Sequence, residues 1–387
     1  AVSAYFGVRN PAHELRVKEL IERACARPVT CGHELTSQLD SVRRATTTAL
    51  NARLIPTLRE LITTVRRLIE QRGIRAPLMI VKGDGSLVQA DWAMQRPIET
   101  ILSGPAASVV GAWHLAGRRD GWVIDVGGTT TDIAVLRGGL PRLNPDGARV
   151  GRWRTMVETV DVHTTGLGGD SHVRVDASTG QLRLGPRRAV PLCQLAAADP
   201  EVVAELRRQV GAREQLDLCG RFCLVQRRPA APHPRDAALL AQLDSRPRSL
   251  PWLVQRLPQG LLAVRQIELL ENNQVLQRGA FTPTDALHVL GRFVRWDVEA
   301  ARLGAQLLAM QLGCPVEQLC ELVVETFSRR LAQELATKAL TDEGAVPQWQ
   351  ADTAAAALLA RALGQHPDSA LACSLKLREA VVAVGAP

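Results

Sequence analysis

The clearest chemical signal in the sequence is a run of eight residues, DVGGTTTD, at positions 125–132. Its two glycines carry no side chain, so the surrounding backbone N–H groups can converge on an anion. The hydroxyls of Thr129 and Thr130 can add donors. Asp125 and Asp132 cannot face a phosphate unaided, and they make sense if they orient Mg²⁺, its waters or a nucleophile. The predicted phosphate ligands are Gly127, Gly128, Thr129 and Thr130, and the predicted catalytic residues are Asp125 and Asp132. An ordinary glycine hairpin is the alternative, although such a turn needs no flanking acids.

A second glycine-rich turn, GLGGDS at 166–171, follows a predicted strand and is expected to form another wall of the same cleft. Its candidate phosphate or substrate contacts are Gly166, Gly168 and Gly169. Just before this turn, Asp161 and His163 point to one side of a strand by alternation. Together with Asp125 they are the candidate metal ligands. A turn with a hydrogen-bonded histidine would explain Asp161 and His163 equally well.

Two other groups give weaker signals. The segment KGDGS at 82–86 follows a strand, where α/β sheets place ligands, but a polar tight turn explains it equally well. Cys31, His33 and Glu34 include the residue types of a nucleophile and its base, yet catalytic partners usually converge from distant segments. The eight cysteines lack the doubly paired spacing of a structural zinc site, which predicts reduced, buried thiols in a cytoplasmic protein.

The composition restricts the class of protein. The 387 residues, 46% of them apolar and 22% charged, suffice for two domains or one large domain and exclude a disordered or fibrous chain. The sequence shows neither an apolar run long enough to span a bilayer nor the features of a signal peptide, so we expect no membrane partner. The net charge of +8 comes from scattered arginines, with four lysines and 3% aromatics, which argues against a nucleic-acid partner.

An α/β framework is expected to position these residues, because short apolar runs alternate with segments of helical periodicity. The predicted strands are 77–81, 122–126, 131–136, 156–162 and 379–384. The predicted helices are 11–27, 52–71, a run of small residues opening at 103–105, and most of 298–338. Residues 229–247 are interpreted as a loop or insertion, and Thr284 with Asp285 as the cap of the helix that follows.

Several of these motifs, in this order, resemble the hydantoinase A / 5-oxoprolinase family. The matching segments are Arg44–Ala52, Ser103–Ala112, Asp125–Asp132, His163–Ser171 and Thr284–Ala286. The resemblance implies an α/β fold with a ribonuclease H-like (actin-like ATPase) core and helical additions. The expected organisation is a helical entry segment at 1–75, a phosphate-binding core at 76–190, an insertion or irregular subdomain at 191–280 and a helix-rich segment at 281–387 that returns to the core.

The resemblance also implies a function. Members of the family use ATP, with Mg²⁺, to phosphorylate the oxygen of a cyclic amide or an enol, usually alongside a B-type subunit or domain. The expected activity is therefore ATP-dependent hydrolysis of a hydantoin, lactam or 5-oxoproline-like small molecule. A sugar-kinase-type phosphotransferase, an ATP-dependent ketone carboxylase subunit and a catalytically silent scaffold remain alternatives, and a homo-oligomer remains open.

Two features depart from the family pattern. The family's N-terminal domain carries a matching Asp-x-Gly-Gly-Thr loop, and this sequence has only the one at 125–129, so the resemblance predicts a fragment of a larger protein that may be inactive alone. The family's Pro-Gly-Pro-Ala-Cys-Tyr type segment is replaced by GPRRAVPLC at 185–193, and Asp170 interrupts the usual glycine triplet. These departures leave the substrate open.

Overall fold

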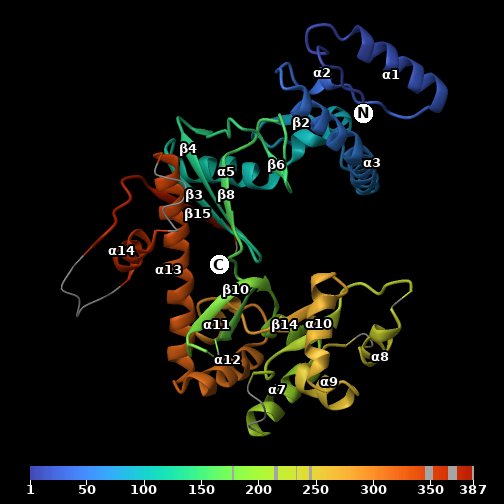
Figure 1. Cartoon of the computed structure of the whole chain (residues 1–387). Helices are drawn as coiled ribbons and strands as arrows, with labels where there is room; N and C mark the ends of the chain where they lie inside the picture. The colour runs from blue at the N-terminus through green and yellow to red at the C-terminus, as the bar shows by residue number, and fades with distance from the viewer. Residues whose placement is uncertain are drawn as a thin grey trace. The chain divides into compact units, whose positions relative to one another are not determined.

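A computed structural model of the chain describes residues 1–176, 178–212, 217–231, 233–243, 246–344, 352–364 and 373–385 (Figure 1). The chain forms two compact units. Unit 1 consists of Ala1–Asp125, Asp132–His163 and Leu377–Val384, and unit 2 of Val126–Thr131, Thr164–Lys376 and Gly385–Pro387. The DVGGTTTD motif therefore gives its glycines and threonines to unit 2 and its two aspartates to unit 1.

A sheet with helix α5 (Ser103–Ala116) packed on it forms the core of unit 1. Its strand order is β15–β3–β4–β5, and β8 also pairs with β4. The strands are β3 (Gly121–Val126), β4 (Thr131–Arg137), β5 (Leu140–Pro141), β8 (Val162–Thr165) and β15 (Val381–Gly385). Ala106 and Ala112 of α5 are small enough to lie close to Val123 and Ala134 of the sheet. Since β3 and β4 flank the glycine turn, this packing fixes both arms of the predicted hairpin.

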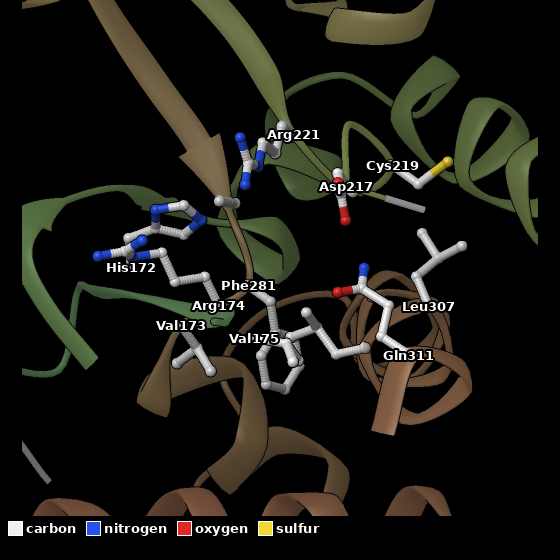
Figure 2. A pocket seen from close by; sticks show the side chains of 14 residues that line it. His172, Val173, Arg174, Val175, Asp217, Cys219, Arg221, Phe281, Leu307 and Gln311 are labelled. Carbon is white, nitrogen blue, oxygen red and sulfur yellow. The ribbon is translucent and has the colours of Figure 1, made fainter. Parts of the chain in front are cut away.

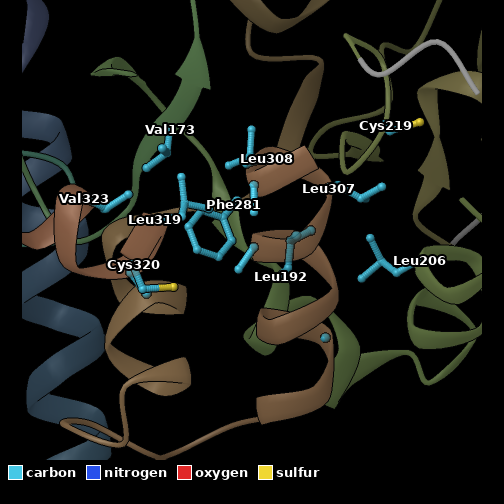
Figure 3. Close-up of a cluster of buried hydrophobic side chains, with 14 of the residues drawn as sticks. Val173, Leu192, Leu206, Cys219, Phe281, Leu307, Leu308, Leu319, Cys320 and Val323 are labelled. Atoms are coloured by element: carbon cyan, nitrogen blue, oxygen red, sulfur yellow. The ribbon is translucent and has the colours of Figure 1, made fainter. Parts of the chain in front are cut away.

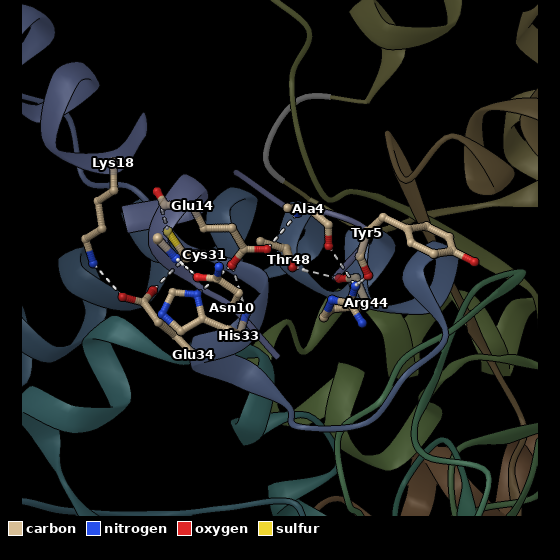
Figure 4. A network of polar contacts seen from close by, with 11 residues as sticks. Ala4, Tyr5, Asn10, Glu14, Lys18, Cys31, His33, Glu34, Arg44 and Thr48 are labelled. Atoms are coloured by element: carbon tan, nitrogen blue, oxygen red, sulfur yellow. Dashed lines mark hydrogen bonds and ion pairs between the residues drawn. The ribbon is translucent and has the colours of Figure 1, made fainter. Parts of the chain in front are cut away.

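The first hundred residues of unit 1 pack around the long helix α3 (Ser41–Gln71), which buries polar side chains on one face. Arg44 donates hydrogen bonds to the carbonyl oxygens of Ala4 and Tyr5 at 2.8 and 2.7 Å (Figure 4), and Asn51 bonds three further segments. The other elements are α1 (Ala12–Cys25), α2 (Gly32–Leu35), β1 (Met79–Val81), β2 (Leu87–Gln89), α4 (Ala90–Gln95), η1 (Pro97–Thr100), β6 (Arg149–Val150) and β7 (Trp153–Arg154). This segment is thus held by hydrogen bonds as well as by apolar contacts.

Unit 2 consists of two small sheets and a set of helices. One sheet has the order β11–β14–β12–β13, with β11 parallel to β14, and β9 pairs with β10 in an antiparallel ribbon. The strands are β9 (Ser171–Val175), β10 (Leu182–Arg188), β11 (Val190–Pro191), β12 (Phe222–Val225), β13 (Arg248–Ser249) and β14 (Leu276–Ala280). The helices are α6 (Leu192–Ala198), α7 (Glu201–Ala212), α8 (Pro234–Gln242), α9 (Leu250–Arg256), α10 (Leu262–Asn272), α11 (Pro283–Val289), α12 (Val298–Leu312), α13 (Val316–Asp342) and α14 (Thr353–Leu363). Phe281, Leu192 and Leu319 lie in its largest apolar cluster (Figure 3).

The structure confirms the predicted strands at 77–81, 122–126, 131–136 and 379–384 to within a few residues. The strand at 156–162 is wrong, because β8 begins only at Val162 and the preceding residues bond irregularly, Val160 to Gly83 and Thr159 to Asn144. The loop at 229–247 contains helix α8. The helix after 281 is capped by Thr282 rather than Thr284, with Asp285 completing a reciprocal capping box.

The remaining helix predictions differ in length. The predicted helix at 52–71 is part of α3, which begins eleven residues earlier at Ser41. The run at 298–338 is two helices, α12 and α13, which meet at 89° where Gly313 adopts a positive φ and Pro315 follows. Within the described part of the chain, no single helix is long and apolar enough to cross a membrane, although this bent pair together meets that test by length and composition.

Candidate functional site

The turn of the DVGGTTTD motif has backbone N–H groups that are free to bind a ligand. The N–H of Gly127 donates to the carbonyl of Thr130 at 2.9 Å, which closes the turn. The N–H groups of Gly128, Thr129 and Thr130 have no acceptor among the residues that the structure describes. Thr129 is exposed and its neighbours are half-buried, so this turn is accessible to solvent. Three amide donors on one exposed turn are a suitable arrangement for binding an anion.

The second glycine-rich turn packs directly against the first. The N–H of Gly169 donates to the carbonyl of Gly127 at 3.1 Å, and the N–H of Asp170 to that of Gly128 at 2.8 Å. A Cβ atom on Gly168 would lie 2.4 Å from the carbonyl oxygen of Gly128, so this close approach requires glycine. The hydroxyl of Thr131 adds a bond to the carbonyl of Leu167 at 2.7 Å, and the two turns form one supported structure.

This packing uses the amide groups that were candidate phosphate ligands in the second turn. Gly168 donates its N–H to the hydroxyl of Ser171 at 3.0 Å, and Gly169 donates to Gly127. The predicted contact of Gly168 and Gly169 with phosphate stays a prediction, without an unpaired N–H to support it. Gly166 lies against Pro186 of β10. What these glycines do in the structure is position the turn at 127–130.

Helix α11 holds the second turn through hydrogen bonds to Gly169. The hydroxyl and N–H of Thr284 both donate to the carbonyl of Gly169, at 2.8 and 3.0 Å. Asp285 is fully buried and accepts bonds from the N–H groups of Leu192 and Cys193 and from Thr282. Burial raises the pKa of Asp285, although these donors act in the opposite direction. The resemblance pointed to this Thr-Asp-Ala segment, and its role here is to join the turn to α6 and α11.

A hollow of about 320 Å³ lies beside Thr129 and is rich in arginine. Its charged lining residues are Arg187, Arg188, Arg278 and Glu271. Arg188 pairs with Asp170 at 2.9 Å, and Glu271 accepts from Arg278 at 2.6 Å and from Arg187 at 3.3 Å. Arg187 also lies 3.7 Å from Glu268, so the three arginines have three carboxylate partners in all. The charged side chains that line the hollow itself are nevertheless three cations and one anion. The sequence gives no signal for these residues, because Arg187 and Arg188 are two among its many scattered arginines.

The two aspartates of the motif are half-buried in unit 1. Asp125 is near the end of β3, and its Oδ2 accepts a hydrogen bond from the hydroxyl of Ser108 on α5 at 2.5 Å. Its Oδ1 has no hydrogen-bond donor among the described residues. Asp132 is the second residue of β4. The local fold therefore holds Asp125 in place through Ser108 while one of its carboxylate oxygens remains available.

Asp161 and His163, the other two predicted metal ligands, lie immediately before strand β8 and within it, in unit 1. The carboxylate of Asp161 accepts a bond from the Nε of Arg142 at 3.1 Å. A metal ion would have to compete with that guanidinium, and the assignment of Asp161 and His163 as metal ligands stays a prediction. Within the described ranges, the group of His, Cys, Asp and Glu side chains that lie close enough to share an ion is Glu14, Cys31 and His33.

This group of three joins the N-terminal segments of unit 1 (Figure 4). Glu14 is fully buried and accepts bonds from the N–H of Ala4 at 2.7 Å, the N–H of His33 at 3.0 Å and the His33 ring Nδ1 at 2.6 Å. These bonds lower the pKa of Glu14 although burial acts to raise it. Burial and the nearby carboxylate of Glu34 raise the pKa of the Cys31 thiol to about 11. A protonated thiol is a poor nucleophile, so the contacts indicate a structural role.

The segment at 82–86 is a polar turn, which is the alternative that its sequence suggested to a ligand site. Lys82 pairs with Asp84 at 3.0 Å and with Glu99 at 3.3 Å, and Asp84 also accepts from the N–H and hydroxyl of Ser86. A Cβ atom on Gly83 would lie 2.1 Å from the carbonyl oxygen of Ile101, so this glycine is required by close packing. Its charges are satisfied within the turn and its neighbours.

Comparisons with known proteins give consistent relatives. A family model described as hydantoinase/oxoprolinase matches residues 44–347. The caprolactamase subunit alpha of Pseudomonas jessenii is 32% identical over 193 residues, which are 49% of this chain and 27% of that protein. The acetophenone carboxylase gamma subunit of Aromatoleum aromaticum is 27% identical over 215 residues, which are 52% of this chain and 29% of that subunit.

Solved structures give the same result for the fold. The nucleotide-free structure of acetone carboxylase matches with a TM-score of 0.53 and 18% identity over 89% of this chain and 40% of that one. The crystal structure of an ATP-dependent caprolactamase from Pseudomonas jessenii matches with a TM-score of 0.50 and 23% identity over 85% of this chain and 38% of that one. These likenesses confirm the predicted α/β fold. The chain spans less than half the length of these relatives.

Proposed function

This chain belongs to the hydantoinase/oxoprolinase family, and on that premise we propose that it is the nucleotide-binding component of an ATP-dependent hydrolase of cyclic amides. The proposed substrate is a hydantoin, a lactam or a 5-oxoproline-like ring. The ATP dependence named for the caprolactamase and acetone carboxylase structures supports the use of ATP here. The relatives named as alpha, beta and gamma subunits support a partner subunit, which we propose to be of the B type.

The observation that carries this proposal is the set of unpaired N–H groups at Gly128, Thr129 and Thr130. Backbone donors at the solvent can bond water, but three of them on one supported turn are held ready to bond an external anion in its place. A phosphate oxygen accepts such bonds strongly because it is charged. The arginine-lined hollow beside Thr129 supports the same interpretation, since guanidinium groups can bind a polyanion on this side of the turn.

The residues of the DVGGTTTD motif have different roles in the proposed reaction. Bound ATP and Mg²⁺ supply a phosphoryl group and charge neutralisation, which turn an amide oxygen into part of a better leaving group. The turn at 127–130 binds and orients the phosphate oxygens through backbone N–H groups and the hydroxyls of Thr129 and Thr130. Asp125, held by Ser108, offers its available carboxylate oxygen to the magnesium ion or to its waters. We assign Asp132 to orient the nucleophile or a magnesium-bound water.

A second candidate function is ATP-dependent carboxylation of a ketone, as a subunit of a larger enzyme. It is favoured by the acetone carboxylase structure, which matches 89% of this chain, and by the two ketone carboxylase subunits among the relatives. Both reactions begin with activation of an oxygen by ATP, so the nucleotide turn serves either. The difference lies in the product, which is a ring-opened carboxylic acid in one case and a carboxylated ketone in the other.

The test begins with MgATP binding to the full chain, measured by calorimetry. Thr129→Ala combined with Thr130→Ala removes two hydroxyl donors, and we expect about tenfold to a hundredfold weaker binding. The control is Thr63→Ala, an exposed residue of α3. Equal binding by the double variant and the wild type would remove the hydroxyls from the site.

Turnover is then assayed with the full-length protein and its partner subunit. Phosphate release and products are measured with lactams, hydantoins, 5-oxoproline, and ketones with bicarbonate. A ring-opened product supports the hydrolase, a carboxylated ketone supports the second candidate, and an accumulating phosphorylated product indicates a kinase. Asp125→Asn is expected to lower the productive rate at least a hundredfold. Absence of ATP turnover with every substrate would contradict both functions and indicate a scaffold.

A further inference from the structure

A second hollow, of about 280 Å³, lies in unit 2 and plays no part in the proposed nucleotide site. Strand β9 supplies His172 and Arg174, the loop before β12 supplies Asp217 and Arg221, and α12 supplies Leu307 and Gln311. In Figure 2 the nitrogen-bearing ends of His172 and Arg221 face the same open space. Its volume is near the lower limit for ligand pockets, about 300–1,000 Å³, so it fits a small molecule.

Two arginines of this hollow form no hydrogen bond or ion pair through their side chains with the described part of the chain. The guanidinium of Arg221 is half-buried, and that of Arg174 is exposed; neither has a hydrogen bond or ion pair with any residue that the structure describes. The neighbouring arginines differ, because Arg278 and Arg187 both pair with Glu271. Burial, and next the charge of Arg278, lower the pKa of Arg221. The charge of Asp217 acts in the opposite direction, although Asp217 forms no ion pair with Arg221. A half-buried guanidinium without a hydrogen-bonded partner gains the most from a bound carboxylate, which can accept two parallel bonds from it.

His172 adds a neutral donor beside these cations. It is 4% exposed, and burial, followed by the charges of Arg278 and Arg221, holds its pKa well below the usual value. Its Nδ1 lies 3.5 Å from Nη1 of Arg278, which can only donate. Nδ1 is therefore the acceptor in that contact, and Nε2 carries the proton. The imidazole thus offers a hydrogen-bond donor without titrating near neutral pH.

Most of the remaining lining residues are apolar. Val175, Phe281 and Leu307 are among its lining residues, and Asp217 is the acidic one. Apolar walls favour a ligand with a hydrocarbon body, and a carboxylate in the lining disfavours a dianion such as phosphate. Arginine at one side and hydrocarbon at the other match a molecule that carries a single negative charge and a short apolar chain.

We propose that this hollow binds a small organic monocarboxylate, whose carboxylate pairs with Arg221 and Arg174 and whose apolar body lies against Phe281 and Leu307. The site does not depend on the function proposed for the glycine turn, and it is tested without nucleotide. The ligand class follows from the charge and shape of the hollow alone.

The experiment measures dissociation constants for the full chain by ligand-observed NMR. Butyrate is the probe, butyramide is its uncharged counterpart, acetate lacks most of the apolar body, and inorganic phosphate is a polar anion. We expect butyrate to bind at least about tenfold more tightly than butyramide and about threefold more tightly than acetate, because both the charge and the chain contribute. Phosphate is expected not to displace butyrate.

Variants then locate the site. Arg221→Gln is expected to weaken butyrate binding at least about tenfold, and Arg174→Gln about threefold. The matched control is Arg265→Gln, an exposed residue of α10, which is expected to leave the affinity unchanged. If Arg221→Gln does not fold, the exposed Arg174→Gln alone decides. Absence of butyrate binding, equal binding of butyramide, displacement by phosphate, or unchanged affinity in the arginine variants would each overturn the proposal.

Discussion

Gly168→Ala tests whether the second glycine turn positions the first. The added Cβ atom would lie 2.4 Å from the carbonyl oxygen of Gly128 and 2.6 Å from that of Gly127. Both are backbone atoms and cannot rotate away as a flexible side chain can. To restore even 3.0 Å, the two turns must separate by about 0.6 Å, which lengthens the bonds from Gly169 and Asp170 to the first turn.

The expected cost combines two effects. Overpacking costs about 1–3 kcal/mol, and weakening two backbone hydrogen bonds costs about 1 kcal/mol or less each. We therefore expect Gly168→Ala to lower the free energy of unfolding by about 2–4 kcal/mol, measured by urea denaturation. Because the turn at 127–130 must shift, MgATP affinity measured by calorimetry should fall at least about tenfold.

The control for this variant is Gly211→Ala near the end of α7. A Cβ atom there has no neighbour within 4 Å, and the backbone is helical, so the variant should be neutral or more stable by up to about 1 kcal/mol. A Gly168→Ala protein with wild-type stability and wild-type nucleotide affinity would refute the idea that one turn supports the other. Reduced stability with unchanged affinity would separate the packing of the turns from nucleotide binding.

Three further predictions concern other parts of the molecule. Arg44→Met removes the buried donor to the carbonyls of Ala4 and Tyr5 and should lower the free energy of unfolding by at least about 3 kcal/mol in urea denaturation; a loss below about 1 kcal/mol would contradict its structural role. Iodoacetamide at pH 8 should modify the exposed Cys25 and Cys373 well before Cys31, as measured by peptide mass spectrometry. The pKa of about 11 leaves roughly 0.1% of Cys31 as thiolate at this pH, and early labelling of Cys31 would be inconsistent with its burial. The pKa of His172 is lowered in the folded protein, so the unfolded state binds a proton first as the pH falls below about 6.5. The free energy of unfolding should therefore decrease by up to about 1.4 kcal/mol per pH unit down to pH 5. His172→Gln should reduce that slope.

Local features of the fold could be predicted from the sequence. The hairpin formed by β3 and β4 could be predicted because the two strands are consecutive in the sequence and a glycine turn joins them. The break between α12 and α13 had its signal in Gly313 and Pro315, which the helical periodicity on both sides obscured. The prediction of a strand at 156–162 was wrong. Its apolar residues are buried, but its backbone bonds residues 142–148 and Gly83 irregularly, and an apolar run of this kind has the same sequence pattern as a strand.

The candidate site could be predicted only in part. The unpaired amides lie where the motif indicated, since a glycine turn sets its own local geometry. The arginine-rich hollow beside Thr129 could not be found, because Arg187 and Arg278 are far apart in the sequence and converge only through the fold. The partner of Asp161 could not be predicted for the same reason, because Arg142 is distant from it in the sequence.

The pairing of β15 with β3 has a consequence for the order in which the protein is made. The carbonyl of Ala380 accepts the N–H of Trp122 at 2.9 Å, and Glu379 pairs with Arg137 at 2.7 Å, across an interval of 242 residues. A ribosome therefore releases both strands of the motif's hairpin long before it has translated their outer neighbour. During that interval one edge of β3 is open to other strands, so slow translation near the end of the chain favours mispairing, and chaperone protection would be most useful then.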